Sequence, residues 1–215
     1  MHKPRRLLSK AVYLFSIGGN DYIKLTSDPS IVLTPIDELK YVGMVLGNFT
    51  TVIKAIYNKG GRKFAFQNVG PLGCMPATTS MAPKNSTIFK CVEEPQTIAR
   101  LHNTILSKLL ERLAIQLPEF KYSLFDYHTS LAERTLSPFK FGFKIGENAC
   151  CGSGRHNGHF TCGQENYTLC SNPGEHVWFD AGHPTESTNK QLADLLWSGH
   201  PNVTAPYTLK MFFEK

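Results

Sequence analysis

The sequence lacks several features that would point to membranes or nucleic acid. It has no run of about 18 apolar residues, the length a membrane-spanning helix needs, so no transmembrane segment is predicted. The formal net charge is +6, but Lys and Arg are scattered and only residues 2–6 form a basic cluster. Because nucleic-acid binding needs basic residues gathered on one face, a solvated basic surface is favoured. No secretory leader is recognised, since the apolar run at 11–17 is short and ends directly in Gly18 and Gly19.

Cysteines and glycosylation motifs nevertheless point to an oxidising compartment. The six cysteines are Cys74, Cys91, Cys150, Cys151, Cys162 and Cys170, and the Asn-x-Ser/Thr motifs begin at Asn48, Asn85, Asn166 and Asn202. Two histidines lie between Cys151 and Cys162, but the last four cysteines are spaced one, eleven and eight residues apart. Zinc modules space paired ligands two to four residues apart, so disulfides are favoured over a metal. A Cys74–Cys91 bridge would close the loop before the second long helix, although six cysteines allow 15 connectivities.

The hydrophobic pattern alternates strands with helices. Short runs of β-forming residues predict strands at 11–17, 64–69 and 121–128. Apolar spacings of three and four predict helices at 35–59, 95–117, 129–135 and 184–197, with Gly60 and Gly61 ending the first. Residues 75–92 and the Cys-rich segment 138–175 are predicted to be loops. This order indicates an α/β domain with a parallel sheet.

Three polar residues are candidates for catalysis. Asn20 follows the first predicted strand, at the sheet edge where ligands of parallel sheets gather, and its amide could donate to an oxyanion. The alternative is an asparagine that bonds its own backbone in a tight turn. His183 could be a general base oriented by Asp180, or simply a polar residue near a helix N-terminus without a catalytic role.

Four sequence blocks together resemble the plant GDSL-type esterase/lipase family of SGNH hydrolases. They are FSIGGNDY (15–22), GRKFAFQNVGPLGCMP (61–76), ACCGSGRHNGHFTCG (149–163) and VWFDAGHPTE (177–186). Within the family, the sequence is most similar to secreted lipases implicated in plant defence. The resemblance implies a three-layer α/β/α fold and hydrolysis of a small-molecule acyl ester or lipid, without metal or organic cofactor. It implies that His183 is the base, that Asp180 orients it, that Asn20 is an oxyanion donor and that Gly18 permits the tight turn.

One block of that family is missing from the sequence. There is no Gly-Asp-Ser nucleophile block and no Gly-x-Ser-x-Gly elbow. Residues 1–215 are therefore interpreted as a partial domain without its N-terminal strands, comprising the Cys-rich loop and, at 176–199, the Asp-x-x-His block with the final helix. Such a domain is predicted to be inactive alone and to expose an apolar sheet edge.

Alternatives to the hydrolase reading follow from the missing serine. The chain could be an acyl-ligand-binding module or a structural secreted glycoprotein, and Ser16 or Ser153 would be the substitutes if a nucleophile is present after all. The full-length family member is expected to be secreted. No oligomeric state is predicted.

Overall fold

The computed structural model describes residues 3–26, 31–82, 89–164 and 166–214. The chain forms two compact units. The first combines residues 1–69, 98–127 and 194–215, and the second combines residues 70–97 and 128–193. None of the helices in these described ranges has the length and apolar character needed to cross a membrane.

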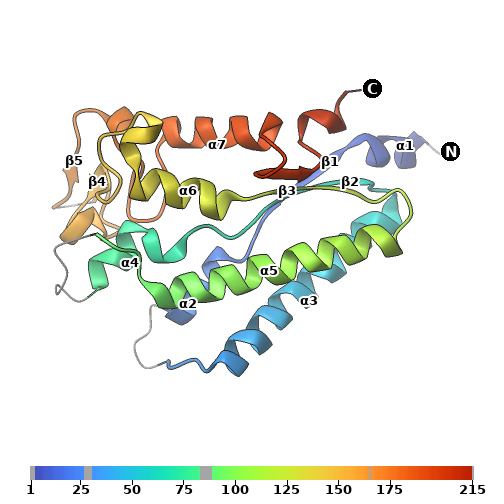
Figure 1. Cartoon of the computed structure of the whole chain (residues 1–215), viewed down its shortest axis with the longest axis horizontal. Helices are drawn as coiled ribbons and strands as arrows, with labels where there is room; N and C mark the ends of the chain where they lie inside the picture. The colour runs from blue at the N-terminus through green and yellow to red at the C-terminus, as the bar shows by residue number, and fades with distance from the viewer. Residues whose placement is uncertain (1–2, 27–30, 83–88, 165, 215) are drawn as a thin grey trace. The chain divides into compact units, whose positions relative to one another are not determined.

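The first unit is built on a four-stranded sheet (Figure 1). Its order is β1 (Val12–Ser16), β2 (Lys63–Gln67), β3 (Lys121–Phe125) and β6 (Thr204–Pro206). The first three strands are parallel and β6 is antiparallel. Because the parallel strands are aligned in register, their carboxyl ends meet at one edge of the sheet and their amino ends at the other.

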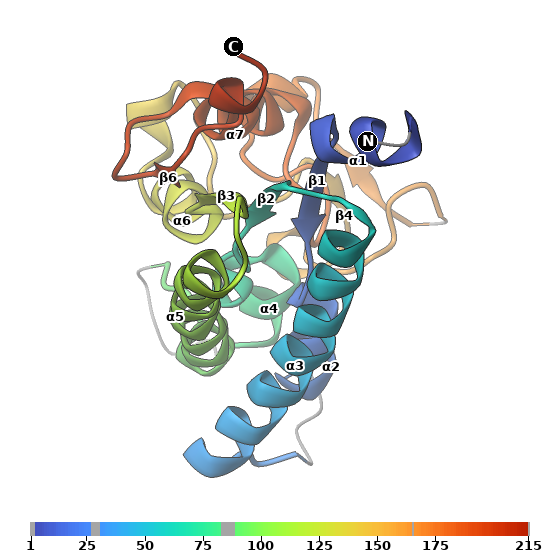
Figure 2. The same ribbon diagram turned by 90° about the vertical axis from the view of Figure 1, so that its right-hand side faces the viewer.

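Aromatic side chains on one face of this sheet account for the packing of the helices. The side chains of Phe15 and Phe66 stack, with ring centroids 5.5 Å apart, and Phe49 of α3 (Pro35–Lys59) meets both edge-on. From Ile98 onward, α5 (Glu93–Gln116) contributes buried leucines, and Figure 2 shows α3 and α5 on the same side of the sheet. On the opposite face, the ammonium group of Lys63 donates to the carbonyl of Phe212 in η5 (Lys210–Phe212). The predicted α/β class, with a parallel-dominated sheet flanked by helices, is confirmed.

Local signals explain the ends of the longest helix. Thr34 and Asp37 form a reciprocal capping box at the start of α3, and Gly60 ends the helix with a φ of 117°. At the sheet edge, β1 has no partner strand on its outer side among the described residues, and Leu14 and Ile17 are exposed.

The second unit is held by three disulfides, as the sequence predicts. They join Cys74 to Cys91, Cys150 to Cys170 and Cys151 to Cys162. The unit contains η1 (Leu72–Cys74), α4 (Pro76–Met81), most of α6 (Tyr127–Leu136), η2 (Pro138–Phe141), η3 (Arg155–Asn157), η4 (Pro173–Glu175) and the start of α7 (Glu186–Ser198). A two-stranded antiparallel ribbon joins β4 (Cys151–Gly152) to β5 (Thr168–Leu169). Since every cysteine is bridged, none is left as a thiolate ligand for zinc.

Several predictions about local structure were wrong. The helix α4 lies inside the segment predicted to be a loop, and β4 and β5 interrupt the Cys-rich loop. The third strand ends at Phe125 instead of residue 128, because α6 begins at Tyr127. The helices α1 (Lys3–Lys10) and α2 (Gly19–Thr26) were not predicted. In α2, the Gly-Gly-Asn-Asp stretch read as a turn opens a helix, and Asp21 lies in its first turn, where negative charge is favourable.

Candidate active site

The candidate base lies in a tight turn of the second unit, between η4 and α7. The N–H groups of Phe179 and Asp180 both donate to the carbonyl of His183, at 2.7 and 3.3 Å. This turn brings the Asp180 carboxylate back onto the imidazole, so that its Oδ1 lies 2.8 Å and its Oδ2 3.0 Å from His183 Nδ1. The predicted Asp–His pair is therefore formed.

The carboxylate of Asp180 is held in place from three directions. Its Oδ1 accepts the backbone N–H groups of Gly182 at 2.9 Å and of His183 at 2.8 Å, in addition to its contact with the imidazole. The Asp180 side chain is 21% exposed, whereas that of His183 is 75% exposed. A carboxylate bound to Nδ1 selects the neutral tautomer whose Nε2 is the proton acceptor, and no described residue bonds Nε2. The imidazole thus presents a free basic nitrogen to solvent.

Buried hydroxyl groups anchor the turn to the start of α7. Thr185 Oγ1 donates to the carbonyl of His176 at 2.8 Å, and Thr188 Oγ1 donates to that of Val177 at 2.9 Å. Both threonines are almost fully buried. Thr185 Oγ1 also accepts the backbone N–H of Thr188 at 3.3 Å, which satisfies one of the free donors at the helix N-terminus.

The Cys-rich segment supports the other side of the turn. The N–H groups of Cys150 and Cys151 donate to the carbonyls of Trp178 and Phe179, at 3.0 and 2.7 Å. Both cysteines are buried and bridged. The bridged cysteines therefore hold the backbone segment that leads directly into Asp180. In this way the Cys-rich segment helps to position the Asp–His pair.

In the first unit, Asn20 lies in the first turn of α2, just after the carboxyl end of β1. Its side chain is exposed and makes no hydrogen bond with any described residue. Among the described residues, the Asn20 amide therefore has no partner that would keep it from donating. Gly18 precedes α2 with a φ of 112°, a backbone conformation that side-chain-bearing residues rarely adopt.

A buried pair beneath Gly18 was missed by sequence reasoning. A side chain on Gly18 would meet Val69, His102 and Tyr22, at 3.0, 3.2 and 3.2 Å from its Cβ. The Tyr22 hydroxyl and His102 Nδ1 share a hydrogen bond of 2.6 Å. The available signal was the helical spacing of His102, four residues after Ile98 and four before Leu106, which places it on the buried stripe of α5.

The two substitute serines have other partners. Ser16 Oγ accepts from Gln67 Nε2 at 3.1 Å, and Ser153 Oγ accepts from Thr161 Oγ1 at 2.8 Å. Neither serine hydroxyl bonds a histidine side chain among the described residues. No cluster of three or more candidate metal ligands occurs in the described ranges.

The glycosylation candidates are accessible where they are described. Asn48 in α3, Asn166 and Asn202 are all exposed. Asn85 lies outside the described residues. Exposure is the physical requirement for modification of these asparagines, so these three remain candidates.

The chain has a parallel-dominated α/β sheet flanked by helices, the fold of SGNH hydrolases, with an asparagine just after β1 and an Asp–His pair just before α7. Residues 3–196 match the family GDSL-like Lipase/Acylhydrolase, and the chain belongs to this family. The resemblance seen in the four sequence blocks is thereby confirmed.

The relatives of this chain are plant proteins of greater length. The chain is 46% identical to GDSL esterase/lipase 4 of Arabidopsis thaliana, over 97% of this chain and 56% of that protein. It is also 46% identical to GDSL lipase of Tanacetum cinerariifolium, over 99% of this chain and 55% of that protein. A relative from Arabidopsis thaliana that is 38% identical, over 94% of this chain and 47% of its own length, is named inactive GDSL esterase/lipase-like protein 25. The chain spans little more than half the length of the first two.

Proposed function

We propose that this chain carries the base and one oxyanion donor of a serine ester hydrolase acting on acyl esters or lipids. The observation that carries the proposal is the Asp180–His183 pair, with Nδ1 on the carboxylate and Nε2 free. In this reaction Nε2 takes the proton of a serine hydroxyl as the serine attacks the ester carbonyl, and later returns it to the leaving alcohol. Asp180 stabilises the imidazolium that forms in between.

The free amide of Asn20 supplies the second part of the chemistry. As the carbonyl carbon becomes tetrahedral, its oxygen gains negative charge, and a positioned N–H donor lowers the barrier by roughly 2.7–4 kcal/mol. An amide without an intramolecular partner loses no protein hydrogen bond when it turns to the oxyanion. Gly18 and the buried Tyr22–His102 pair fix the position of the backbone that carries Asn20.

The serine itself is proposed to lie outside these 215 residues. The sequence has no Gly-Asp-Ser block, and the serines considered as substitutes bond other side chains. Members of a triad work as a unit, so a base without its nucleophile leaves only residual catalysis. The 215-residue chain alone is therefore proposed to be inactive.

A second candidate function is binding of an acyl ligand without turnover. It is favoured by the absent serine and by the relative named inactive. For either function, the three disulfides and the exposed Asn-x-Ser/Thr motifs support a secreted glycoprotein.

The decisive experiment compares two forms of the protein. The transcript upstream of Met1 is read, and if it encodes a Gly-Asp-Ser segment, both the longer protein and the 215-residue chain are assayed with p-nitrophenyl butyrate. We expect turnover by the longer protein only. His183→Ala should abolish it, and Asn20→Ala should lower kcat about 10²–10³-fold.

His200→Ala is the matched control for the histidine substitution, because His200 is exposed and its imidazole bonds, among the described residues, only the nearby N–H of Asn202. Full kcat in the longer protein carrying His183→Ala would refute the assignment of the base. If the 215-residue chain hydrolyses the ester and His183→Ala abolishes this turnover, the proposal that the nucleophile lies outside the chain is refuted. An upstream region with a stop codon in every frame, together with fatty-acid binding, would favour the binding module.

A further inference from the structure

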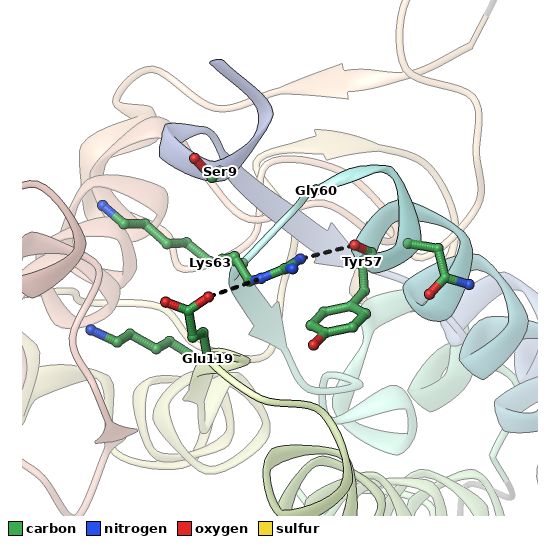
Figure 3. A pocket seen from close by; sticks show the side chains of 8 residues that line it. Ser9, Tyr57, Gly60, Lys63 and Glu119 are labelled. Atoms are coloured by element: carbon green, nitrogen blue, oxygen red, sulfur yellow. Dashed lines mark hydrogen bonds and ion pairs between the residues drawn. The ribbon is translucent and has the colours of Figure 1, made fainter. Parts of the chain in front are cut away.

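A hollow of about 480 Å³ lies at the amino ends of β2 and β3 in the first unit (Figure 3). Asn20 follows the carboxyl end of β1, so the hollow and Asn20 lie at opposite ends of the parallel strands. Its lining includes the charged side chains of Arg62, Lys63, Glu119 and Lys121. Lys and Arg are cationic and Glu is anionic at neutral pH, so three positive charges and one negative charge leave a net charge of +2.

The register of the sheet brings two of these cations together. Lys63 and Lys121 are the first residues of β2 and β3 and are direct partners in the parallel pairing. Like charges at paired positions destabilise a sheet. The Lys63 ammonium group donates to the carbonyl of Phe212, and that of Lys121 lies 5.8 Å from the ring of Tyr207. Neither of these contacts supplies a negative charge.

Arg62 is fixed in position with donors to spare. Its Nη1 donates to the carbonyls of Tyr57 and Gly61, at 2.9 and 2.7 Å, and its guanidinium lies 4.1 Å from the Tyr57 ring centroid. The ring is itself held, because the Tyr57 hydroxyl donates to the carbonyl of Pro118 at 2.8 Å. Among the described residues, Nη2 has no partner. A cation already ordered in this way loses little conformational freedom when it binds an anion.

The single carboxylate does not cancel this charge. Glu119 Oε2 is 3.8 Å from Arg62 Nε, and the Glu119 side chain is 82% exposed. Exposed ion pairs of this length contribute little. In Figure 3 the dashed lines mark this ion pair and the hydrogen bond to the Tyr57 carbonyl.

We propose that this hollow binds a phosphate monoester. A monoester carries a charge of about −1.5 to −2 at neutral pH, which complements the net charge of the lining. Arginine and lysine together are the usual partners of phosphate oxygens. The volume falls within the range of roughly 300–1,000 Å³ typical of small-molecule sites, so the group that bears the phosphate also fits. The site is independent of ester hydrolysis.

The test uses isothermal titration calorimetry on the full 215-residue chain with glycerol 3-phosphate at low ionic strength. We expect saturable binding with a Kd of about 1 mM or tighter. Replacing both lysines (Lys63→Gln with Lys121→Gln) should weaken binding at least about tenfold, because each removes a charged donor. Lys121→Gln alone should weaken it several-fold, and because that side chain is exposed, this variant should retain the fold.

Lys54→Gln is the matched control, since Lys54 is an exposed lysine of α3 outside the hollow and loses the same charge. Glycerol is the uncharged ligand control. A second arm measures co-sedimentation with vesicles of phosphatidylcholine, with and without phosphatidate. Binding to phosphatidate vesicles that glycerol 3-phosphate displaces identifies a lipid headgroup, and binding to the free monoester alone identifies a soluble ligand. Absence of binding in both arms would overturn the proposal, as would equal affinities in Lys121→Gln and Lys54→Gln.

Discussion

Acidification should weaken the first unit through one buried histidine. His102 is 1% exposed and Tyr22 is fully buried, and the two share the hydrogen bond beneath Gly18. Burial disfavours the charged imidazolium and lowers the pKa of His102 from its ordinary 6.5 to about 4. Burial likewise raises the pKa of Tyr22, so this hydroxyl stays neutral and provides no charge to stabilise an imidazolium.

The sign and size of the effect follow from proton linkage. In the unfolded chain this histidine binds a proton near pH 6.5, and in the folded chain only near pH 4. Between these values the unfolded state therefore holds more protons, so the free energy of unfolding falls as the pH falls. The contribution of His102 is fully present above about pH 6.5 and lost by about pH 4. The whole shift corresponds to about 3 kcal/mol, of which about 2 kcal/mol is lost by pH 5.

The measurement is equilibrium urea unfolding followed by circular dichroism at several pH values from 7 to 5. His102→Gln should be less stable at pH 7 by about 1–2 kcal/mol, because a buried hydrogen bond is altered. It should also lose less stability than the native chain on acidification, by about 2 kcal/mol. His200→Gln, at an exposed histidine, should keep the native pH dependence.

The comparison between variants is needed because the pKa of His156 is also lowered, by burial and by Arg155. That histidine acts in the same direction and is present in every variant, so the difference isolates His102. An unchanged loss of stability between pH 7 and 5 in His102→Gln would refute the reasoning. It would mean that the buried imidazole is already protonated in the folded protein.

Three further substitutions have defined outcomes. Gly18→Ala should destabilise the chain by about 1–3 kcal/mol in urea unfolding, because Gly18 has a positive φ and close neighbours. Its control Gly43→Ala, with open space in α3, should stabilise the chain by up to about 1 kcal/mol. A Gly18→Ala variant that is more stable than Gly43→Ala would contradict the backbone argument. Replacing Cys74 and Cys91 by alanine should cost about 3 kcal/mol for a bridge that spans 17 residues, and an unchanged urea midpoint would count against it. Asp180→Asn in a longer, active protein should lower kcat roughly 10³–10⁴-fold. Its Tm should change little, because the amide oxygen still accepts both backbone N–H groups. A native kcat would show that orientation of the imidazole by the carboxylate is not needed.

Sequence alone determined those parts of the molecule that depend on neighbouring residues. The bounds of α3 were predicted as residues 35–59, because apolar periodicity and Gly60 act within a few turns of one helix. The Cys74–Cys91 bridge was predicted because it closes one short loop. The Asp180–His183 pair was predicted because both partners lie in a single turn, and the order of four short blocks pointed to the family.

Tertiary structure decided whatever depends on residues distant in the chain. Tyr22 meets His102 across 80 positions, and Lys63 meets Lys121 only through the register of two strands. The short helix α2 was misread because glycine and asparagine favour turns locally, while the packing of Tyr22 on α5 favours the helix. Hydrophobic periodicity shows that a side chain is buried. The partner it meets there depends on how the helices and strands pack, and no local pattern contains that information.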